Sequence, residues 1–473
     1  MKLQLVELPT VERRDGQVLF IFPSRPYWFA ASPEVADIVS LLGSETDSGT
    51  ALSALAELWE TDINDVRSDF DEVIDLLRDN GVLMVNGLAD ASEDATLTPT
   101  HQVSEVERVL IIATTRACNL PCMHCHVNAR TPLPDELGTE EIKAVIDQVA
   151  TMPWDKSITH IALTGGEIFL RPDALELIEH VAEQGFHPFV NTNATLLNES
   201  LIEQLAEVPR LKVSISLDGA DAQTHEYIRG PDTFDATIAA ISSLVQRGVP
   251  VAANMFVHGG NLAHVGDTLE LARSLGMQGF NCLPLMRVGR ANSRRSQRLL
   301  VPVSEVNLYR TLFGLLRDSA EYRALMKRST FVNQIMGVAG GVKSHYCGVG
   351  TNRALYLMAD GSLYPCPDTA SKQFLLGNLR EDNLAGIWEE HPILEELRGL
   401  DVDTMNPVCA ACDVRYQCGG NCRGEHFQVT GNITEPHFNC TEIRRSIIEM
   451  MWMLTEEPMF FQEAVDTLYD RAG

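Results

Sequence analysis

The eight residues Cys118-Asn-Leu-Pro-Cys122-Met-His-Cys125 are the most informative stretch of this chain. They directly follow a strand-like run, VLIIATT at 109–115. Three thiolates on one short loop can ligate three irons of a [4Fe–4S] cluster and leave the fourth iron open to another ligand. A zinc site is the alternative, although the spacing differs from the paired C-x2-C of structural zinc sites. The loop therefore predicts an iron–sulfur cluster at the end of a strand.

Strand-like and helical segments alternate after this loop. Strand-like runs begin at residues 109, 158, 187, 211, 251 and 279, and helical stretches are expected at about 139–152, 172–185, 198–207, 233–248 and 264–275. Strands separated by helices predict parallel βαβ units that close fully or partly into a barrel. In such folds the chemistry takes place at the carboxyl ends of the strands.

The motif Thr164-Gly165-Gly166-Glu167 ends the second of these strands. Together with the three cysteines it resembles the radical S-adenosylmethionine (SAM) superfamily. The resemblance implies that Cys118, Cys122 and Cys125 are catalytic and hold a [4Fe–4S] cluster coordinated with SAM. It also implies that the glycine backbone and Glu167 receive the ammonium group of SAM. A simple turn is the alternative for the glycine pair.

Further residues at the strand ends extend the resemblance. Ser216 and Asp218 end the fourth strand in the run SISLDG, and the superfamily uses this region to contact the ribose or amino acid of SAM. Arg229 would pair with the SAM carboxylate, Asn193 would line the same pocket, and Gly289 lies in an adenine-contacting turn, LMRVGRA. Taken alone, Asp218-Gly219 is a common turn pair and Arg229 could be a surface ion pair.

A second cysteine array occupies the C-terminal part of the chain and resembles the SPASM domain. Cys347 precedes Gly361 and Cys366, and the series Cys409-x2-Cys412-x5-Cys418-x3-Cys422-x17-Cys440 follows. The resemblance implies two auxiliary iron–sulfur clusters, both expected to be [4Fe–4S]. The outer cluster would be ligated by Cys409, Cys412, Cys418 and Cys440, and the inner one by Cys347, Cys366, Cys422 and an unidentified fourth ligand. An open iron that binds a substrate thiolate is one possibility for the inner cluster, and a further protein ligand is the other.

Residues 1–85 contain strand-like runs and three amphipathic helical stretches. The segment from WFAASPEVADIVSLLGS to FDEVIDLLRDNGVLM resembles the winged-helix-like leader-recognition domains of ribosomal peptide maturases. This implies a precursor peptide whose leader docks here by strand addition. A DNA-binding winged helix is the alternative, but the third helical stretch is rich in acidic residues and has only two arginines, which is poor chemistry for contacting phosphate.

Composition limits the partners and the compartment. The chain has 473 residues, a formal net charge of -28 and 45% hydrophobic residues. Such a negative charge disfavours nucleic acid, and no apolar run is long enough for a membrane span or a signal peptide. Clustered cysteines without an export signal, and the oxygen sensitivity of iron–sulfur clusters, favour the reducing cytoplasm. Cys282, on a predicted strand, is expected to be a buried thiol.

The fold class expected is α/β, with a partial (β/α)6 radical SAM barrel, an N-terminal winged-helix-like α+β domain and a C-terminal cysteine-rich SPASM domain. The expected division is a leader-recognition domain at 1–85, a linker at 86–104, the barrel at 105–300, a helical bridge at 301–345, the SPASM domain at 346–442 and a C-terminal helix at 443–473.

The function that these resemblances imply is oxidative modification of a ribosomally made precursor peptide. A 5′-deoxyadenosyl radical would abstract hydrogen, a thioether or C–C cross-link would form, and a flavodoxin or ferredoxin would donate electrons. Peptide decarboxylation or excision would use the same machinery. Two rival functions are that of a SPASM enzyme of the sulfatase-maturing or haem-biosynthesis type, and that of a non-enzymatic iron–sulfur redox sensor with a DNA-binding head.

Overall fold

The computed structural model describes residues 1–89, 108–152, 158–340, 344, 347 and 354–457. Its centre is a run of six parallel strands, which pair in sequence order. β8 pairs on its other side with β14 rather than with the sixth strand, so the barrel is open and the predicted partial barrel is confirmed. The six are β8 (Arg108–Ala113), β9 (Ile158–Thr164), β10 (His187–Thr192), β11 (Lys212–Ser216), β12 (Val251–Val257) and β13 (Gly279–Pro284).

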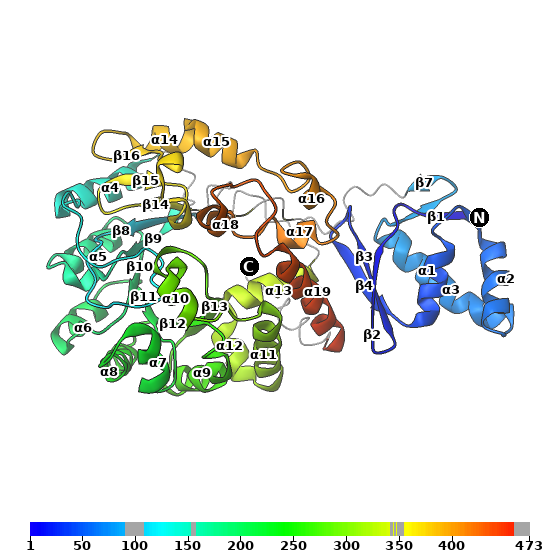
Figure 1. Cartoon of the computed structure of the whole chain (residues 1–473), viewed down its shortest axis with the longest axis horizontal. Helices are drawn as coiled ribbons and strands as arrows, with labels where there is room; N and C mark the ends of the chain where they lie inside the picture. Colours follow the sequence, from blue (N-terminus) through cyan, green and yellow to red (C-terminus); the bar gives the residue numbers. More distant parts are fainter. Residues whose placement is uncertain (90–107, 153–157, 341–343, 345–346, 348–353, 458–473) are drawn as a thin grey trace.

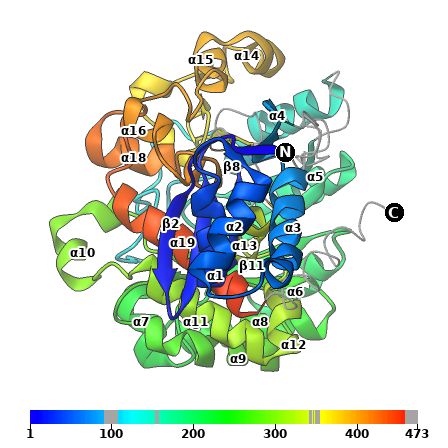
Figure 2. The same ribbon diagram turned by 90° about the vertical axis from the view of Figure 1, so that its right-hand side faces the viewer.

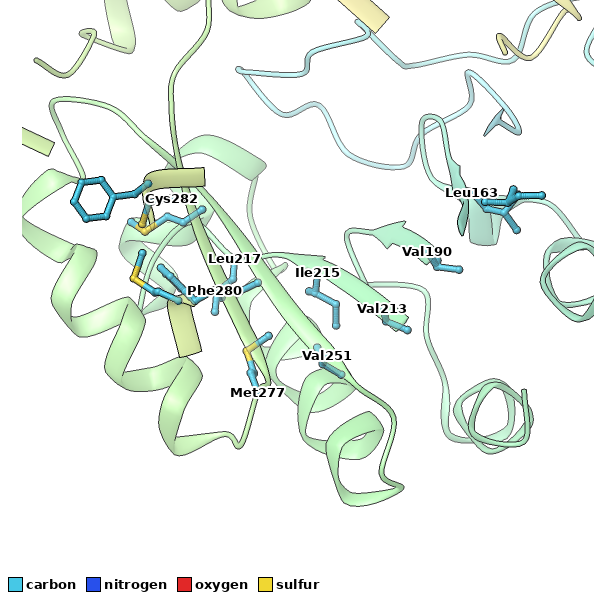
Figure 3. Packing of buried hydrophobic residues seen from close by; sticks show 14 of the residues in the cluster. Leu163, Val190, Val213, Ile215, Leu217, Val251, Met277, Phe280 and Cys282 are labelled. Atoms are coloured by element: carbon cyan, nitrogen blue, oxygen red, sulfur yellow. The ribbon is translucent and has the colours of Figure 1, made fainter. Parts of the chain in front are cut away.

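Helices cover the outer side of this sheet (Figure 1). Each helix presents an apolar stripe to the strands, which is the arrangement that the helical spacing of their apolar residues predicts. The side chains of β11 that share the core with the helices, including Val213 and Ile215, lie in one cluster with Cys282 (Figure 3), a buried thiol as expected. The helices are α4 (Thr139–Thr151), α5 (Ala174–Glu183), α6 (Glu199–Ala206), α8 (Phe234–Gln246) and α9 (Val265–Ser274).

One helix of the barrel, α7 (Ala222–Arg229), is not expected from the sequence. Its sequence AQTHEYIR is mostly polar, so apolar periodicity does not reveal it. The Asp221 side chain caps it by accepting a hydrogen bond from the Thr224 backbone N–H at 2.7 Å. The helix ends with Arg229, which it carries into the interior at the ends of the strands.

The N-terminal unit has a hydrophobic core of its own. The sheet β2-β3-β4 lies between its three helices and the C-terminal helix α19 (Figures 1 and 2). Phe20 of β3 faces the N-terminal core, whereas Leu19 and Ile21 face the core shared with the barrel and α19. The elements are β1 (Lys2–Leu5), β2 (Thr10–Arg14), β3 (Gln17–Phe22), β4 (Tyr27–Ala31), α1 (Pro33–Leu41), β5 (Thr46–Asp47), α2 (Ser48–Leu58), α3 (Ile63–Asp79) and β6 (Leu83–Val85).

Two predicted boundaries need correction. The predicted linker 86–104 is wrong at its start, because β7 (Leu88–Ala89) pairs with β6 across a tight turn. Asn86 and Gly87 both have positive φ in this turn, as a two-residue Asn-Gly hairpin requires. Residues 90–104 lie outside the described residues. The C-terminal helix predicted at 443–473 begins earlier, since α19 spans Cys440–Glu456, and residues 458–473 are not described.

The C-terminal half extends the barrel sheet. β14 pairs in parallel with β8, and β15 and β16 follow in antiparallel pairing, so the sheet has nine strands among the described residues. Across the described ranges, each helix is too short or too polar to cross a bilayer. The elements are α10 (Arg294–Leu299), α11 (Glu305–Asp318), α12 (Ala320–Met326), α13 (Thr330–Ala339), β14 (Ala354–Leu357), β15 (Ser362–Tyr364), β16 (Gly377–Asn378), α14 (Leu384–Glu390), α15 (Pro392–Arg398), α16 (Pro407–Ala410), α17 (Arg415–Cys418) and α18 (Arg423–Thr430).

Candidate functional site

The loop with the first three cysteines follows β8 at the carboxyl edge of the sheet. Cys122 is buried, and Cys118 and Cys125 are half-buried. The sulfur of Cys118 accepts a hydrogen bond from a backbone N–H at 3.5 Å, and that of Cys125 accepts one at 3.3 Å. Burial raises the pKa of Cys118 to about 11, and the neighbouring Cys122 and Cys125 thiols raise it further. The three thiols therefore share one poorly solvated site.

The glycine pair after β9 packs against the backbone at the start of this loop. The Gly166 N–H donates to the Thr115 carbonyl at 2.7 Å, and the Glu167 N–H donates to the Ala117 carbonyl at 2.8 Å. A Cβ on Gly166 would lie 1.9 Å from the Ala117 oxygen, and one on Gly165, with φ of +137°, would lie 2.3 Å from the Thr115 oxygen. Only glycine allows the two backbones to approach so closely.

The Glu167 carboxylate is buried and connects the ends of two strands. It accepts hydrogen bonds from the Thr192 hydroxyl at 2.7 Å and the Asn193 N–H at 2.8 Å. Burial raises the pKa of Glu167, although these hydrogen bonds oppose the shift. The Asn193 side-chain amide donates to the side-chain oxygen Oδ1 of Asn119 at 3.0 Å and so reaches the cysteine loop. Because a carboxylate offers about four acceptor positions, Glu167 keeps capacity for a further donor such as an ammonium group.

Asp218 and Arg229 form a buried ion pair beside the cysteines. Arg229 Nε lies 2.6 Å from Asp218 Oδ2, and the Phe256 N–H donates to Asp218 Oδ1 at 2.8 Å. Burial alone would raise the pKa of Asp218, but Arg229 and its other neighbours hold it below its ordinary value. Arg229 Nη1 lies 4.0 Å from the Cys122 sulfur. Two residues expected to contact SAM therefore bind each other here, next to a cluster cysteine.

Ser216 is the last residue of β11 and is paired with Asn254 of β12. It is half-buried, and it lies two residues before Asp218 at the same sheet edge. The Asn254 amide donates to the Ser214 hydroxyl at 2.7 Å. The third, fourth and fifth strands thus deliver polar side chains to one edge of the sheet.

His124 is a site residue that the sequence does not single out. Its Nε2 lies 3.4 Å from Arg229 Nη2, and its ring centroid lies 4.8 Å from that of Phe256. Burial lowers the pKa of His124 to about 3, so its imidazole is neutral at physiological pH. A histidine between two cysteines has no sequence signal of burial, and only the fold reveals this contact.

Gly289 and Arg290 fasten the cysteine loop from the sixth strand. A Cβ on Gly289, which has a positive φ of 53°, would lie 2.0 Å from the His126 carbonyl oxygen. The Arg290 N–H donates to the Cys125 carbonyl at 2.9 Å, and its Nη1 donates to the Cys122 carbonyl at 2.8 Å. Arg290 was also missed from the sequence, although it lies inside the LMRVGRA turn. These contacts hold the backbone of Cys122 and Cys125 in place.

The C-terminal cysteines fall into two groups, and within each group the thiols help to raise one another's pKa. Burial raises the pKa of Cys418 to about 12, and Cys412, Cys440 and Cys409 contribute to the rise. Burial also raises the pKa of Cys422, and there the contributing thiols are Cys347 and Cys366. The outer and inner sets that the SPASM resemblance implies contain the same residues, and their assignment to two clusters stays a prediction.

The donor chemistry of these three groups fits iron–sulfur clusters. Buried and half-buried cysteines grouped in threes and fours can supply the thiolates that such clusters require, and binding would displace the thiol protons. Within the described ranges, no three His, Cys, Asp or Glu side chains converge closely enough to hold a single metal ion.

Two family matches cover the cluster-bearing segments. Residues 112–272 match the radical SAM superfamily, and residues 347–413 match the SPASM iron–sulfur cluster-binding domain. The chain is therefore an enzyme, and the alternative of a non-enzymatic redox sensor is wrong.

Relatives of known function share most of the chain. It is 29% identical over 355 residues to an AdoMet-dependent heme synthase of Methanosarcina barkeri, which covers 72% of this chain and 97% of that protein. It is 27% identical over 332 residues to the mycofactocin maturase MftC of Mycobacterium tuberculosis, which covers 69% of this chain and 81% of that protein.

A solved structure with the same fold extends further along the chain. The structure of Streptococcus suis SuiB bound to the precursor peptide SuiA is similar with a TM-score of 0.57 and 14% identity. The similarity covers 93% of this chain and 99% of that one. The similarity to the heme synthase covers 72% of this chain, less than the 93% that the similarity to SuiB covers.

Proposed function

Since this chain is an enzyme that carries a radical SAM domain and a SPASM domain, we propose that it oxidatively modifies a ribosomally made precursor peptide, forming a thioether or C–C cross-link. Its radical SAM domain binds a [4Fe–4S] cluster and SAM, and its SPASM domain binds auxiliary iron–sulfur clusters. The observation that carries the proposal is a groove beside an edge strand of the N-terminal unit. It occurs on a chain that also binds SAM and iron–sulfur clusters.

The chain's own residues prepare the site for this chemistry. Cys118, Cys122 and Cys125 would hold the first cluster, which together with SAM supplies one-electron hydrogen abstraction from an unactivated C–H bond. Arg229 places a buried positive charge 4.0 Å from the Cys122 sulfur, balanced by Asp218. The apolar core between the strands and their helices holds these residues at fixed positions, which favours a productive geometry.

The groove of the N-terminal unit suits an extended peptide. It has a volume of about 580 Å³ and lies between β4, α1 and α3. β4 pairs with β3 on one side and ends the described sheet on the other, so its outer edge can accept a further strand. Apolar side chains of the groove include Phe29, Val35 and Leu76, and the exposed acids Glu34, Asp69 and Glu72 also line it. This chemistry selects a leader with apolar and basic residues.

The N-terminal unit is packed against the rest of the enzyme. The Trp28 indole N–H of β4 donates to the Val338 carbonyl of α13 at 2.9 Å, and Arg14 of β2 forms an ion pair with Glu449 of α19 at 2.7 Å. A peptide bound along β4 would therefore be held at a fixed position relative to the SPASM domain, with which α19 is continuous at Cys440.

Reversal of the groove charges tests the proposal. Glu34→Lys combined with Glu72→Lys should abolish modification of a co-expressed precursor peptide and leave uncoupled SAM cleavage unchanged, because both acids are exposed and distant from the cysteine loop. Asp71→Lys is the matched control, since Asp71 is exposed on α3 but does not line the groove. Unchanged modification by the double variant would reject leader docking in this groove.

A second candidate is a small-molecule oxidation of the haem-biosynthesis type. The similarity over 97% of the M. barkeri heme synthase favours it. That similarity covers 72% of this chain, however, and a small-molecule substrate gives no role to the acidic groove. An enzyme of this second type would work equally well with the groove charges reversed.

A further inference from the structure

The inner group of cysteines is one ligand short of a complete four-thiolate cluster. Cys347, Cys366 and Cys422 form this group, and their spacing leaves the fourth position unassigned. In the structure the Asp368 carboxylate lies beside one of them, with Oδ2 at 3.7 Å from the Cys422 sulfur. Asp368 follows Cys366 by two residues, in the short helix η5 (Pro367–Thr369). An acidic side chain therefore accompanies the three thiols.

The backbone around Asp368 is built to bring it close to Cys422. Cys422 caps α18, and Gly424 is the second residue of that helix. A Cβ on Gly424 would lie 2.3 Å from the Asp368 Cβ, so any other residue would push η5 and α18 apart. The Gln428 side chain of α18 donates to the Asp368 carbonyl at 2.9 Å and holds the two segments together. The position of Asp368 is thus fixed on both sides.

The negative charge of Asp368 beside these thiols favours the binding of a cation. The Asp368 side chain is 13% exposed, so its carboxylate is poorly solvated. A carboxylate among thiols in a poorly solvated site is unfavourable unless positive charge is bound there, which iron would supply. Carboxylate oxygen is an established ligand type for protein-bound iron.

The two carboxylate oxygens of Asp368 face different partners. Oδ1 contacts Nε2 of His126, the residue that directly follows Cys125 of the first cysteine loop. Oδ2 is the oxygen that faces Cys422. The nearby acid Glu425 is engaged elsewhere, because it accepts a hydrogen bond from the Arg287 N–H at 2.7 Å.

We propose that Asp368 is the fourth ligand of the inner auxiliary cluster, with Oδ2 on the iron that the three cysteines leave free. Oδ1 at the same time keeps the cluster site joined to the first cysteine loop through His126. The inner cluster is then closed, and a substrate thiolate does not bind its iron. This assignment depends on the SPASM cofactor and is independent of whether the substrate is a peptide.

Spectroscopy of the fully loaded enzyme tests this assignment. The full chain is purified without oxygen, saturated with SAM to protect the first cluster, and mildly oxidised before electron paramagnetic resonance. Asp368→Ala should show one additional equivalent of [3Fe–4S] signal per chain relative to the unaltered enzyme, because its inner cluster loses the iron without a protein ligand. Asp368→Cys should retain all irons, since it offers a fourth thiolate, and it also keeps the test valid if Asp368→Ala fails to fold.

Glu425→Gln is the matched control, because it removes a half-buried acid from α18, the helix that packs against η5. It should give the signal of the unaltered enzyme. An Asp368→Ala enzyme without extra [3Fe–4S] signal would overturn the assignment, and so would an equal signal from Glu425→Gln. Added thiol should perturb the inner cluster in Asp368→Ala and not in the unaltered enzyme; the same perturbation in both would show that the iron is already open.

Discussion

Arg229 Nε and Asp218 Oδ2 lie 2.6 Å apart in the interior, at the carboxyl edge of the barrel. Asp218 comes from the end of β11, and Arg229 from the end of α7. The pair holds one positive charge next to Cys122 without leaving either charge uncompensated. The two residues for which the resemblance predicts separate contacts with SAM therefore bind each other beside the cysteine loop.

Removal of Arg229 should destabilise the protein strongly. Arg229→Ala leaves the buried Asp218 carboxylate unpaired, which costs roughly 3–5 kcal/mol of unfolding free energy. In an Asp218→Asn background the same change should cost much less. Anaerobic urea unfolding of the two single variants and the double variant measures the coupling. Simple additivity of the two effects would contradict the pairing.

The stability that the Asp218–Arg229 pair contributes depends on pH because the pKa of Asp218 is lowered in the folded protein. Burial raises this pKa, but Arg229 and His124 lower it by more. A depressed carboxyl pKa adds stability above the unfolded pKa of about 3.9, and this stability is lost as pH falls through the folded pKa. We therefore expect the difference between the unaltered enzyme and Asp218→Asn to be constant from neutral pH to about pH 5 and to shrink below it. A difference that shrinks already near pH 7 would argue against a charged Asp218.

Gly166→Ala should detach the first cysteine loop. The new Cβ would lie 1.9 Å from the Ala117 carbonyl, a backbone atom that can move only with the loop. Iron content should fall by about four atoms per chain, SAM cleavage should be lost, and the auxiliary clusters should remain. Gly314→Ala is the control, because nothing lies within 4 Å of its Cβ position. Full iron content in Gly166→Ala would show that this contact is not needed.

The two groups of C-terminal cysteines should lose iron independently. Cys418→Ala and Cys422→Ala should each remove about four irons, from different clusters. Combining Cys418→Ala with Cys409→Ala should add little, because both belong to one group, whereas combining it with Cys422→Ala should remove both clusters. Cys422→Ala should also impair product formation more than SAM cleavage. Iron analysis with Mössbauer spectroscopy distinguishes these outcomes; equal losses from all the double variants would contradict the grouping.

The ion pair between Arg14 and Glu449 should help to dock the N-terminal unit. Glu449 also pairs with Arg310 of α11, so Arg14→Ala leaves its charge partly balanced and the fold intact. We expect the KM for the precursor peptide to rise severalfold while SAM cleavage without peptide stays unchanged. Arg445→Ala serves as the control, since its side chain is 65% exposed on α19, the helix that carries Glu449. An unchanged KM in Arg14→Ala would show that this contact is dispensable.

The sequence predicts those features that depend on local patterns. Alternating strands and helices, the Gly165-Gly166 motif and the cysteine spacings all follow from neighbouring residues. Contacts between distant segments do not, as in the pairing of β14 with β8, which joins Ala354 to Val109. The roles of His124 and Arg290 were missed for the same reason, because each depends on partners brought together by the barrel.

Mass spectrometry of a precursor peptide co-expressed with the enzyme tests the proposed function most directly. We predict a product lighter than the precursor by two hydrogens for each bond formed, and an unmodified peptide when Cys118, Cys122 and Cys125 are all replaced by alanine. A peptide of unchanged mass with the unaltered, cluster-loaded enzyme, or the same mass loss with the triple variant, would contradict the account.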